Sequence, residues 1–200
     1  AGVMALQVSS TQSDGNFNVT AGTLLVNNSS GSGTGQSTVN VSGNATLGGT
    51  GTVGGVSGYA NANVNLTGTN ASTLATLRPG TIDEGTGAHI IGTLSVGGVA
   101  QSNNVTFNNH SQLRISLADD QVDTLAVTGM LSLVTANDHL VIDVSGAQTL
   151  PRYVFATYSS IDGGFDDVQI IGGDNYTIDY SVAGEIAVVV PEPALGSLLG

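Results

Sequence analysis

One stretch of sequence recurs loosely along this chain and sets the period on which the chain can fold. Residues 19–28 read VTAGTLLVNN, residues 44–53 read NATLGGTGTV and residues 91–99 read IGTLSVGGV. Each copy joins small polar residues to a Thr-Leu pair, a short alternating strand and a Gly or Asn corner. Such self-similarity is typical of one supersecondary unit stacked on itself many times. The recurrence predicts a repeat architecture rather than a site for chemistry.

Leucines spaced at similar intervals extend this pattern. The predicted anchors of successive turns are Leu24, Leu47, Leu74, Leu94 and Leu113, at intervals of 19 to 27 residues. One turn of a β-solenoid takes about twenty residues or somewhat more, with insertions at its corners. Apolar and polar residues alternate with period two between the anchors, which is typical of strands. The sequence therefore predicts an all-β solenoid over residues 1–140 and no helix.

The types of hydrophobic residue favour a narrow core. Only 4% of the residues are aromatic and Trp is absent, so branched aliphatic side chains must fill the interior. The interior of a solenoid fits this composition better than a broad globular core does. Four of the five tyrosines lie beyond residue 150. Bulkier residues at one end of a stack predict a β cap over residues 141–190, which would cover the last open turn.

The charge balance restricts the possible partners. Fifteen acidic residues face only three basic ones (Arg78, Arg114 and Arg152), which gives a net charge of −12. A phosphate backbone or an anionic membrane surface would be repelled, whereas cations, neutral glycans and other proteins remain possible partners. There is no cysteine, no apolar run long enough for a membrane span and no visible signal peptide at the N-terminus.

Two of the recurring stretches resemble a known type of repeat. The strings AGTLLVNN at 21–28 and ATLGGTGTV at 45–53 are similar to the autotransporter-associated β-strand repeat of large bacterial surface proteins. That resemblance implies a right-handed parallel β-helix and a place on the cell surface.

The C-terminal end resembles the PEP-CTERM sorting signal of Gram-negative-type bacteria. The motif consists of Pro191, Glu192 and Pro193, and the string DTLAVTG at 123–129 is similar to the usual lead-in. Family members continue with a hydrophobic span and a basic tail, whereas only ALGSLLG follows here. The resemblance implies export, recognition by an exosortase and delivery to the surface or the extracellular matrix.

Clustered carboxylates are the candidate metal ligands. They form two groups, which are Asp119, Asp120 and Asp123, and then Asp162, Asp166 and Asp167. Oxygen-rich loops suit Ca²⁺, but neither group has the spacing of an EF-hand loop. The alternative interpretation is that these residues simply form turns. Calcium is the only cofactor that the sequence suggests.

No catalytic constellation stands out. His89, His110 and His139 lie far apart and none belongs to an HxH or HxxxH pair. A glycosidase needs two carboxylates beside a groove with aromatic platforms, and the predicted solenoid has few residues of either kind. No GxSxG nucleophile motif occurs. We therefore predict a protein that is not an enzyme, without catalytic or cofactor-binding residues.

The predicted function is that of an exported structural protein of the bacterial surface or extracellular matrix. Residues 191–200 would begin the sorting tail, and the protein would lie outside a Gram-negative-type cell. The N-terminal strand at residues 3–8 carries few charges, so as an open edge it predicts self-association into an oligomer or filament. The alternative is a glycan-binding adhesin or a polysaccharide-active β-helix, whose partners would be glycans or matrix polymers.

Overall fold

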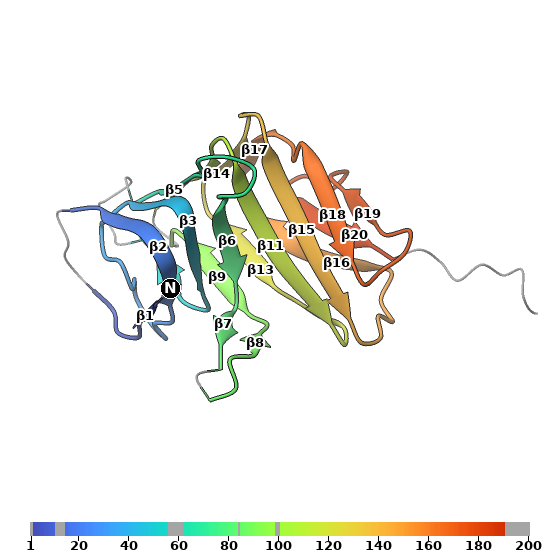
Figure 1. The fold of residues 1–200 in the computed structure, drawn as a ribbon, viewed down its shortest axis with the longest axis horizontal. Coiled ribbons are helices and arrows are strands. Elements are labelled where there is room, and N and C mark those ends of the chain that lie inside the picture. Colours follow the sequence, from blue (N-terminus) through green and yellow to red (C-terminus); the bar gives the residue numbers. More distant parts are fainter. Residues whose placement is uncertain (1, 11–14, 56–61, 84, 99–100, 191–200) are drawn as a thin grey trace, which may run out of the picture.

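The computed structural model describes residues 2–10, 15–55, 62–83, 85–98 and 101–190. Every regular element in this part of the chain is a strand, so the all-β prediction is confirmed. Most strands are parallel and lie in sheets that curl around one core (Figure 1). No helix in these ranges is long and apolar enough to cross a membrane. The right-handed winding of a β-helix stays a prediction.

The strands form three faces, of which the first two belong to one curled sheet. The first face consists of β2 (Phe17–Val26), β3 (Val39–Gly49), β5 (Val64–Thr67), β10 (Val105–Phe107), β14 (Met130–Leu133) and β17 (Ser160–Gly163). Only the first halves of β2 and β3 lie in this face, and all its neighbouring strands are parallel.

The second face contains the longest strands. It consists of β1 (Val3–Leu6), the second halves of β2 and β3, β6 (Ala75–Pro79), β11 (Ser111–Ala118), β15 (Asp138–Ser145) and β18 (Asp167–Ile171). These strands are also parallel to their neighbours. The short strand β12 (Gln121–Val122) pairs with the end of β11 in a hairpin.

The third face is a separate sheet that ends in antiparallel strands. Its order is β4 (Thr52–Val53), β9 (Thr93–Val96), β13 (Thr124–Val127), β16 (Arg152–Thr157), β20 (Glu185–Val189) and β19 (Thr177–Asp179). β20 is antiparallel to both β16 and β19, whereas the earlier pairs are parallel. A small hairpin of β7 (Thr81–Ile82) and β8 (His89–Ile90) projects from the stack (Figure 1).

Successive strands along the chain belong to the first, second and third faces in turn, because the chain winds around the core. The chain supplies β5, β6 and β9 to the first, second and third faces, then β10, β11 and β13, and then β14, β15 and β16. The strands β2 and β3 bend from the first face into the second. The pairing register shifts between Val19 and Ala21 because β3 contributes one extra residue there, and Gly43 in this bulge has a φ of +62°. A bulge and a left-handed glycine both redirect a strand in this way.

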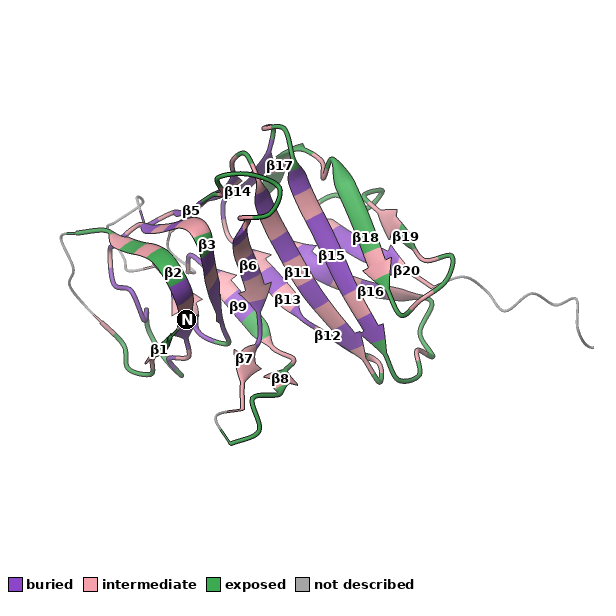
Figure 2. Ribbon diagram, viewed as in Figure 1, coloured by how far each residue is buried: buried purple, intermediate pink, exposed green. Residues whose placement is uncertain are grey.

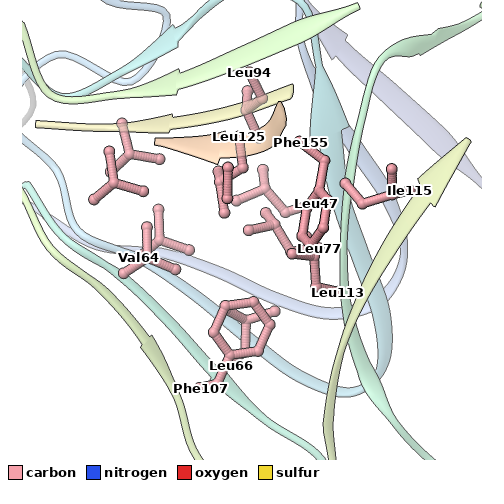
Figure 3. Close-up of a cluster of buried hydrophobic side chains, with 14 of the residues drawn as sticks. Leu47, Val64, Leu66, Leu77, Leu94, Phe107, Leu113, Ile115, Leu125 and Phe155 are labelled. Atoms are coloured by element: carbon pink, nitrogen blue, oxygen red, sulfur yellow. The ribbon is translucent and has the colours of Figure 1, made fainter. Parts of the chain in front are cut away.

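Columns of inward side chains fill the space between the faces (Figure 3). On the second face the paired residues are Leu24, Leu47, Leu77, Leu113 and Leu140, all buried. Strand alternation turns every second residue outward, so buried and half-buried bands alternate along β6 and β11 (Figure 2). Burying one leucine side chain contributes about 1.5–3 kcal/mol, which makes these columns the main stabilising feature.

Two of the five predicted anchor leucines are wrong. Leu77 occupies the column of the second face in place of Leu74, which is only half-buried. Leu94 lies in the third face, where it pairs with Leu125. The intervals between the leucines are irregular because the chain contains the β7–β8 hairpin and short turns between the faces. The spacing of the leucines alone therefore does not identify the face on which each one lies.

The predicted division at residue 140 falls inside β15. Parallel pairing continues beyond it through β18, and antiparallel pairing involves β19 and β20 at the C-terminal end of the third face. Arg152 links these last strands, because it donates to Asp179 at 3.0 Å and to Glu185 at 2.8 Å. The separate cap at residues 141–190 stays a prediction.

Candidate functional site

A hollow lies on the outer side of the second face, beside the β7–β8 hairpin. Its volume is about 190 Å³. The lining consists of Thr23, Leu25, Thr46, Gly48, Thr76, Arg78, Gly80, Ile82, His89, Gln112 and Arg114. We call this hollow the arginine pocket, because two of the three cationic side chains of the protein line it.

Strand register explains the polar floor of the arginine pocket. Thr23, Thr46, Thr76 and Gln112 occupy equivalent outward positions on four adjacent strands, each next to an inward leucine. Adjacent strands lie about 4.8 Å apart, so these side chains form a ladder of hydroxyl and amide groups across the sheet.

The next outward position on each strand gives the pocket its positive charge. Leu25, Gly48 and Arg78 are equivalent there, and Arg114 follows on β11. The neighbouring chain packs closely against Gly48. A Cβ atom at that position would lie 2.6 Å from the carbonyl oxygen of Arg78 and 3.3 Å from Leu25 Cδ2. No side chain larger than that of glycine therefore fits at this position of the pocket lining.

The β7–β8 hairpin forms one wall and is fastened to the stack near its base. Gly49 and Gly80 exchange backbone hydrogen bonds of 2.6 and 3.0 Å. The Nδ2 of Asn27 donates to Thr81 Oγ1 at 2.8 Å, which joins β7 to the end of β2. These contacts hold the wall at a fixed distance from the ladder.

Asp123 fastens the other strand of the hairpin. Its carboxylate is fully buried and accepts hydrogen bonds from the backbone N–H groups of Gly92 at 3.0 Å and Ser116 at 2.9 Å. His89 Nε2 lies 2.7 Å from Asp123 Oδ2 and, facing a carboxylate, acts as the donor. Asp123 thus connects the pocket wall to β11 and to the start of the third face.

The two arginines of the pocket differ in their partners. Arg114 donates from Nε and a terminal nitrogen to both oxygens of Asp143, at 2.6 and 2.9 Å. Arg78 has no carboxylate within 4.0 Å among the residues that the structure describes, and its Nε is buried without a hydrogen-bond partner there. Burial, and then the charge of Arg114, lower the pKa of Arg78 from its ordinary value. A guanidinium nevertheless keeps its proton at neutral pH, so Arg78 is a positive charge on which the carboxylates of Asp143 and Asp123 act only from beyond ion-pair distance.

The first predicted carboxylate group serves the local backbone. Asp119 and Asp120 have φ values of 48° and 63° and connect β11 to β12 as a two-residue turn. Both central residues of a type I′ hairpin turn adopt positive φ, a conformation that Asp tolerates. Asp120 accepts hydrogen bonds from Thr149 and Tyr153, and those from Thr149 contribute most to lowering its pKa to about 2. The turn-forming interpretation is confirmed for this pair.

The second predicted group spreads over the C-terminal end of the first two faces. Asp162 is exposed on β17, and Asp166 accepts a hydrogen bond from the backbone N–H of Asp138 at 3.2 Å. Asp167 lies 3.2 Å from His139 Nδ1. Within the described ranges, no three His, Asp or Glu side chains gather as metal ligands. Calcium binding stays a prediction.

Sequence reasoning missed the arginine pocket although a signal for it was present. Arg78 and Arg114 each directly follow a leucine of the same inward column, Leu77 and Leu113. Alternation along a strand therefore turns both cations to the same outer surface. The histidine of the pocket, His89, belongs to no histidine pair in the sequence, and its carboxylate partner Asp123 is 34 residues away.

The predicted sorting motif of Pro191, Glu192 and Pro193 lies outside the described residues. No protein-family model matches the sequence, and a search of curated proteins finds no match. The resemblances to the autotransporter-associated repeat and to PEP-CTERM proteins therefore stay predictions.

Proposed function

We propose that this chain is an exported structural protein, wound as a right-handed parallel β-helix, whose copies associate end to end at the cell surface or in the extracellular matrix. The stacking of three strands per turn around leucine columns supports the β-helical winding. Export, exosortase recognition and an origin in a Gram-negative-type bacterium rest on the resemblance of the C-terminal motif. The proposal assigns no catalytic role.

The unpaired strand edges at both ends of the second face carry the proposal of self-association. β1 pairs only with β2, and β18 pairs only with β15, among the described strands. Each leaves one edge of backbone N–H and C=O groups open, and such edges are templates for pairing with another chain. Because β1 and β18 lie at opposite ends of the same parallel sheet, pairing between two copies would continue the sheet.

The side chains at these edges also fit a continuing stack. Met4 and Val168 occupy the same column as the buried leucines, at its two ends, and are 55% and 41% exposed. Beside Met4, Val3 is 60% exposed and β1 has no charged residue. A hollow of about 380 Å³ lies at this N-terminal end. End-to-end contact would bury the exposed column ends, and a head-to-tail contact that repeats without closing produces a filament.

A charge placed in β1 tests the proposal. We expect the unmodified chain to sediment as larger species with rising concentration, and the Met4→Lys variant to associate at least about tenfold more weakly, because a lysine protects an open edge. The matched control is Val8→Lys. It adds the same charge at a side chain that is 77% exposed and outside β1, so it should associate like the parent. Sedimentation velocity over a concentration series measures this, and negative-stain electron microscopy shows whether the larger species are filaments.

Two results would refute end-to-end association. One is a parent protein that stays monomeric at every concentration. The other is equal weakening by Met4→Lys and Val8→Lys, since that would make the net charge and not the β1 edge responsible. Thermal unfolding of each variant establishes that the fold is retained.

A further inference from the structure

The arginine pocket has a property that end-to-end assembly does not require. In a protein of net charge −12, Arg78 stands without a carboxylate partner within the described residues, and its Nε is both buried and unbonded. A buried N–H group of a charged side chain without a hydrogen-bond acceptor costs free energy. Arg78 also lines the arginine pocket, so an acceptor that enters the pocket from solution meets its side chain.

We propose that the arginine pocket binds the carboxylate group of an acidic sugar, with Arg78 as the principal donor. A guanidinium presents parallel N–H groups that match the two oxygens of a carboxylate. Arg114 lies beside it, but its charge is balanced by the bidentate ion pair with Asp143, which leaves Arg78 as the principal donor. His89 and the hairpin close the opposite side of the pocket.

The rest of the lining favours a sugar as the carrier of that carboxylate. The ladder of Thr23, Thr46, Thr76 and Gln112 offers hydroxyl and amide groups at the spacing of adjacent strands. A uronic acid carries ring hydroxyls next to its carboxylate, so it can use the ladder and the guanidinium together. The volume of about 190 Å³ is below the roughly 300–1,000 Å³ of sites for drug-sized ligands, which suits a single sugar residue.

The overall charge separates this ligand from multiply charged polyanions. A nucleic acid carries closely spaced phosphates, and a protein of net charge −12 repels it over its whole surface. One carboxylate held against one unpaired guanidinium meets much less repulsion. The site therefore fits an isolated acidic sugar within a glycan.

The experiment is a titration of the ¹⁵N-labelled chain with glucuronic acid, followed by its amide resonances. We expect the amides of Arg78, Gly80 and Gln112 to shift with glucuronic acid and not with glucose. Arg78→Gln should weaken binding at least about tenfold, because it removes a charge-assisted hydrogen bond. Arg78→Lys should retain part of the affinity. The charge-matched control is Arg152→Gln, outside the pocket, which should bind like the parent.

The proposal is overturned if glucuronic acid shifts no pocket amide, if glucose binds as well, or if Arg78→Gln binds like the parent. It is also overturned if inorganic phosphate binds more tightly than glucuronic acid, since the pocket would then be a phosphate site. Repeating the titration on the Met4→Lys variant keeps the result independent of end-to-end association.

Discussion

At the scale of single residues, Asp138 at the start of β15 has an incompletely satisfied carboxylate. Ser111 Oγ donates to Asp138 Oδ1 at 2.7 Å, whereas Oδ2 is buried without a partner within the described chain. Burial raises the pKa of Asp138 to about 6, and the hydrogen bond from Ser111 only partly opposes this. The neighbouring charge of Asp166 raises it further. Below about pH 6 the side chain of Asp138 is therefore mainly protonated in the folded state.

This pKa predicts how stability changes with pH. An unfolded Asp has a pKa of about 3.9, so between about pH 4 and pH 6 the folded chain binds a proton that the unfolded chain has lost. The free energy of unfolding should then fall as the pH rises through this window, by about 3 kcal/mol at most. Asp138→Asn should remove this fall and make the variant more stable than the parent above pH 6. Urea unfolding at several pH values measures both.

Asp174→Asn is the control, because Asp174 is exposed. It should follow the pH dependence of the parent. If Asp138→Asn keeps the same decline between pH 4 and pH 6, the buried carboxylate is not its source.

Asparagine side chains link successive strands on the outer side of the first face. Asn40 Nδ2 donates to Asn18 Oδ1 at 3.0 Å, and Asn65 Nδ2 donates to Asn40 Oδ1 at 3.0 Å. The three residues are in register on β2, β3 and β5. The parallel pairing of these strands thus places asparagines at equivalent positions next to one another. Each amide satisfies its neighbour, as in other parallel stacks.

At the scale of elements, the β7–β8 hairpin depends on one buried carboxylate. Asp123 accepts three hydrogen bonds, from His89, Gly92 and Ser116. Asp123→Asn turns an NH₂ group toward at least one of these donors, which should cost about 1–3 kcal/mol of stability. Amide hydrogen exchange of Thr81 and Ile90 should accelerate more than exchange in β11, because the hairpin loses one of its attachments.

Asp162→Asn is the matched control for this change, since Asp162 is exposed on β17 and lies outside the hairpin. It should leave exchange in β7 and β8 unaltered. Equal exchange rates in the Asp123→Asn variant and the parent would show that the backbone contacts at Gly80 and the Asn27 amide suffice to hold the wall.

The positions of the strands could be predicted from the sequence better than the pairing between strands could. Alternation correctly identified strands and inward leucines such as Leu24, Leu47 and Leu113. It could not distinguish Leu74 from Leu77 in one apolar run, and it could not assign Leu94 to the third face. The two errors have different causes, because Leu74 precedes β6, whereas Leu94 is an inward residue on a strand of another face. Period two gives the inward or outward direction of a side chain but not the strand beside it.

Predicting the arginine pocket from the sequence would require knowing which strands lie next to one another. The floor of the pocket depends on the pairing of Thr46 with Thr76 and of Gly48 with Arg78. Its wall depends on the contact between His89 and Asp123, which are 34 residues apart. The lengths of the insertions between strands determine which residues become neighbours. No local sequence pattern shows how far an insertion extends away from the stacked strands. The turn at Asp119 and Asp120, by contrast, is local and was among the alternatives that the sequence offered.

At the scale of the whole molecule, the open strand edges favour end-to-end association, whereas the net charge opposes it. The open strands β1 and β18 lie at opposite ends of one parallel sheet, so each copy offers both halves of a repeating contact. Every copy also carries a net charge of −12, which repels other copies at long range. The carboxylates Asp162, Asp166 and Asp167 add to this at the C-terminal end, whereas β1 has no cation to pair with them.

This balance predicts that salt strengthens end-to-end association. Raising NaCl from about 20 mM to about 300 mM shortens the screening length to less than about 10 Å, which suppresses the repulsion between copies but leaves backbone pairing and apolar burial intact. The association constant from sedimentation should therefore rise about tenfold or more. Met4→Lys should show a smaller rise, because its edge is blocked at any salt concentration. Association that weakens with salt would mean that charge pairs, and not the open strand edges, hold the copies together.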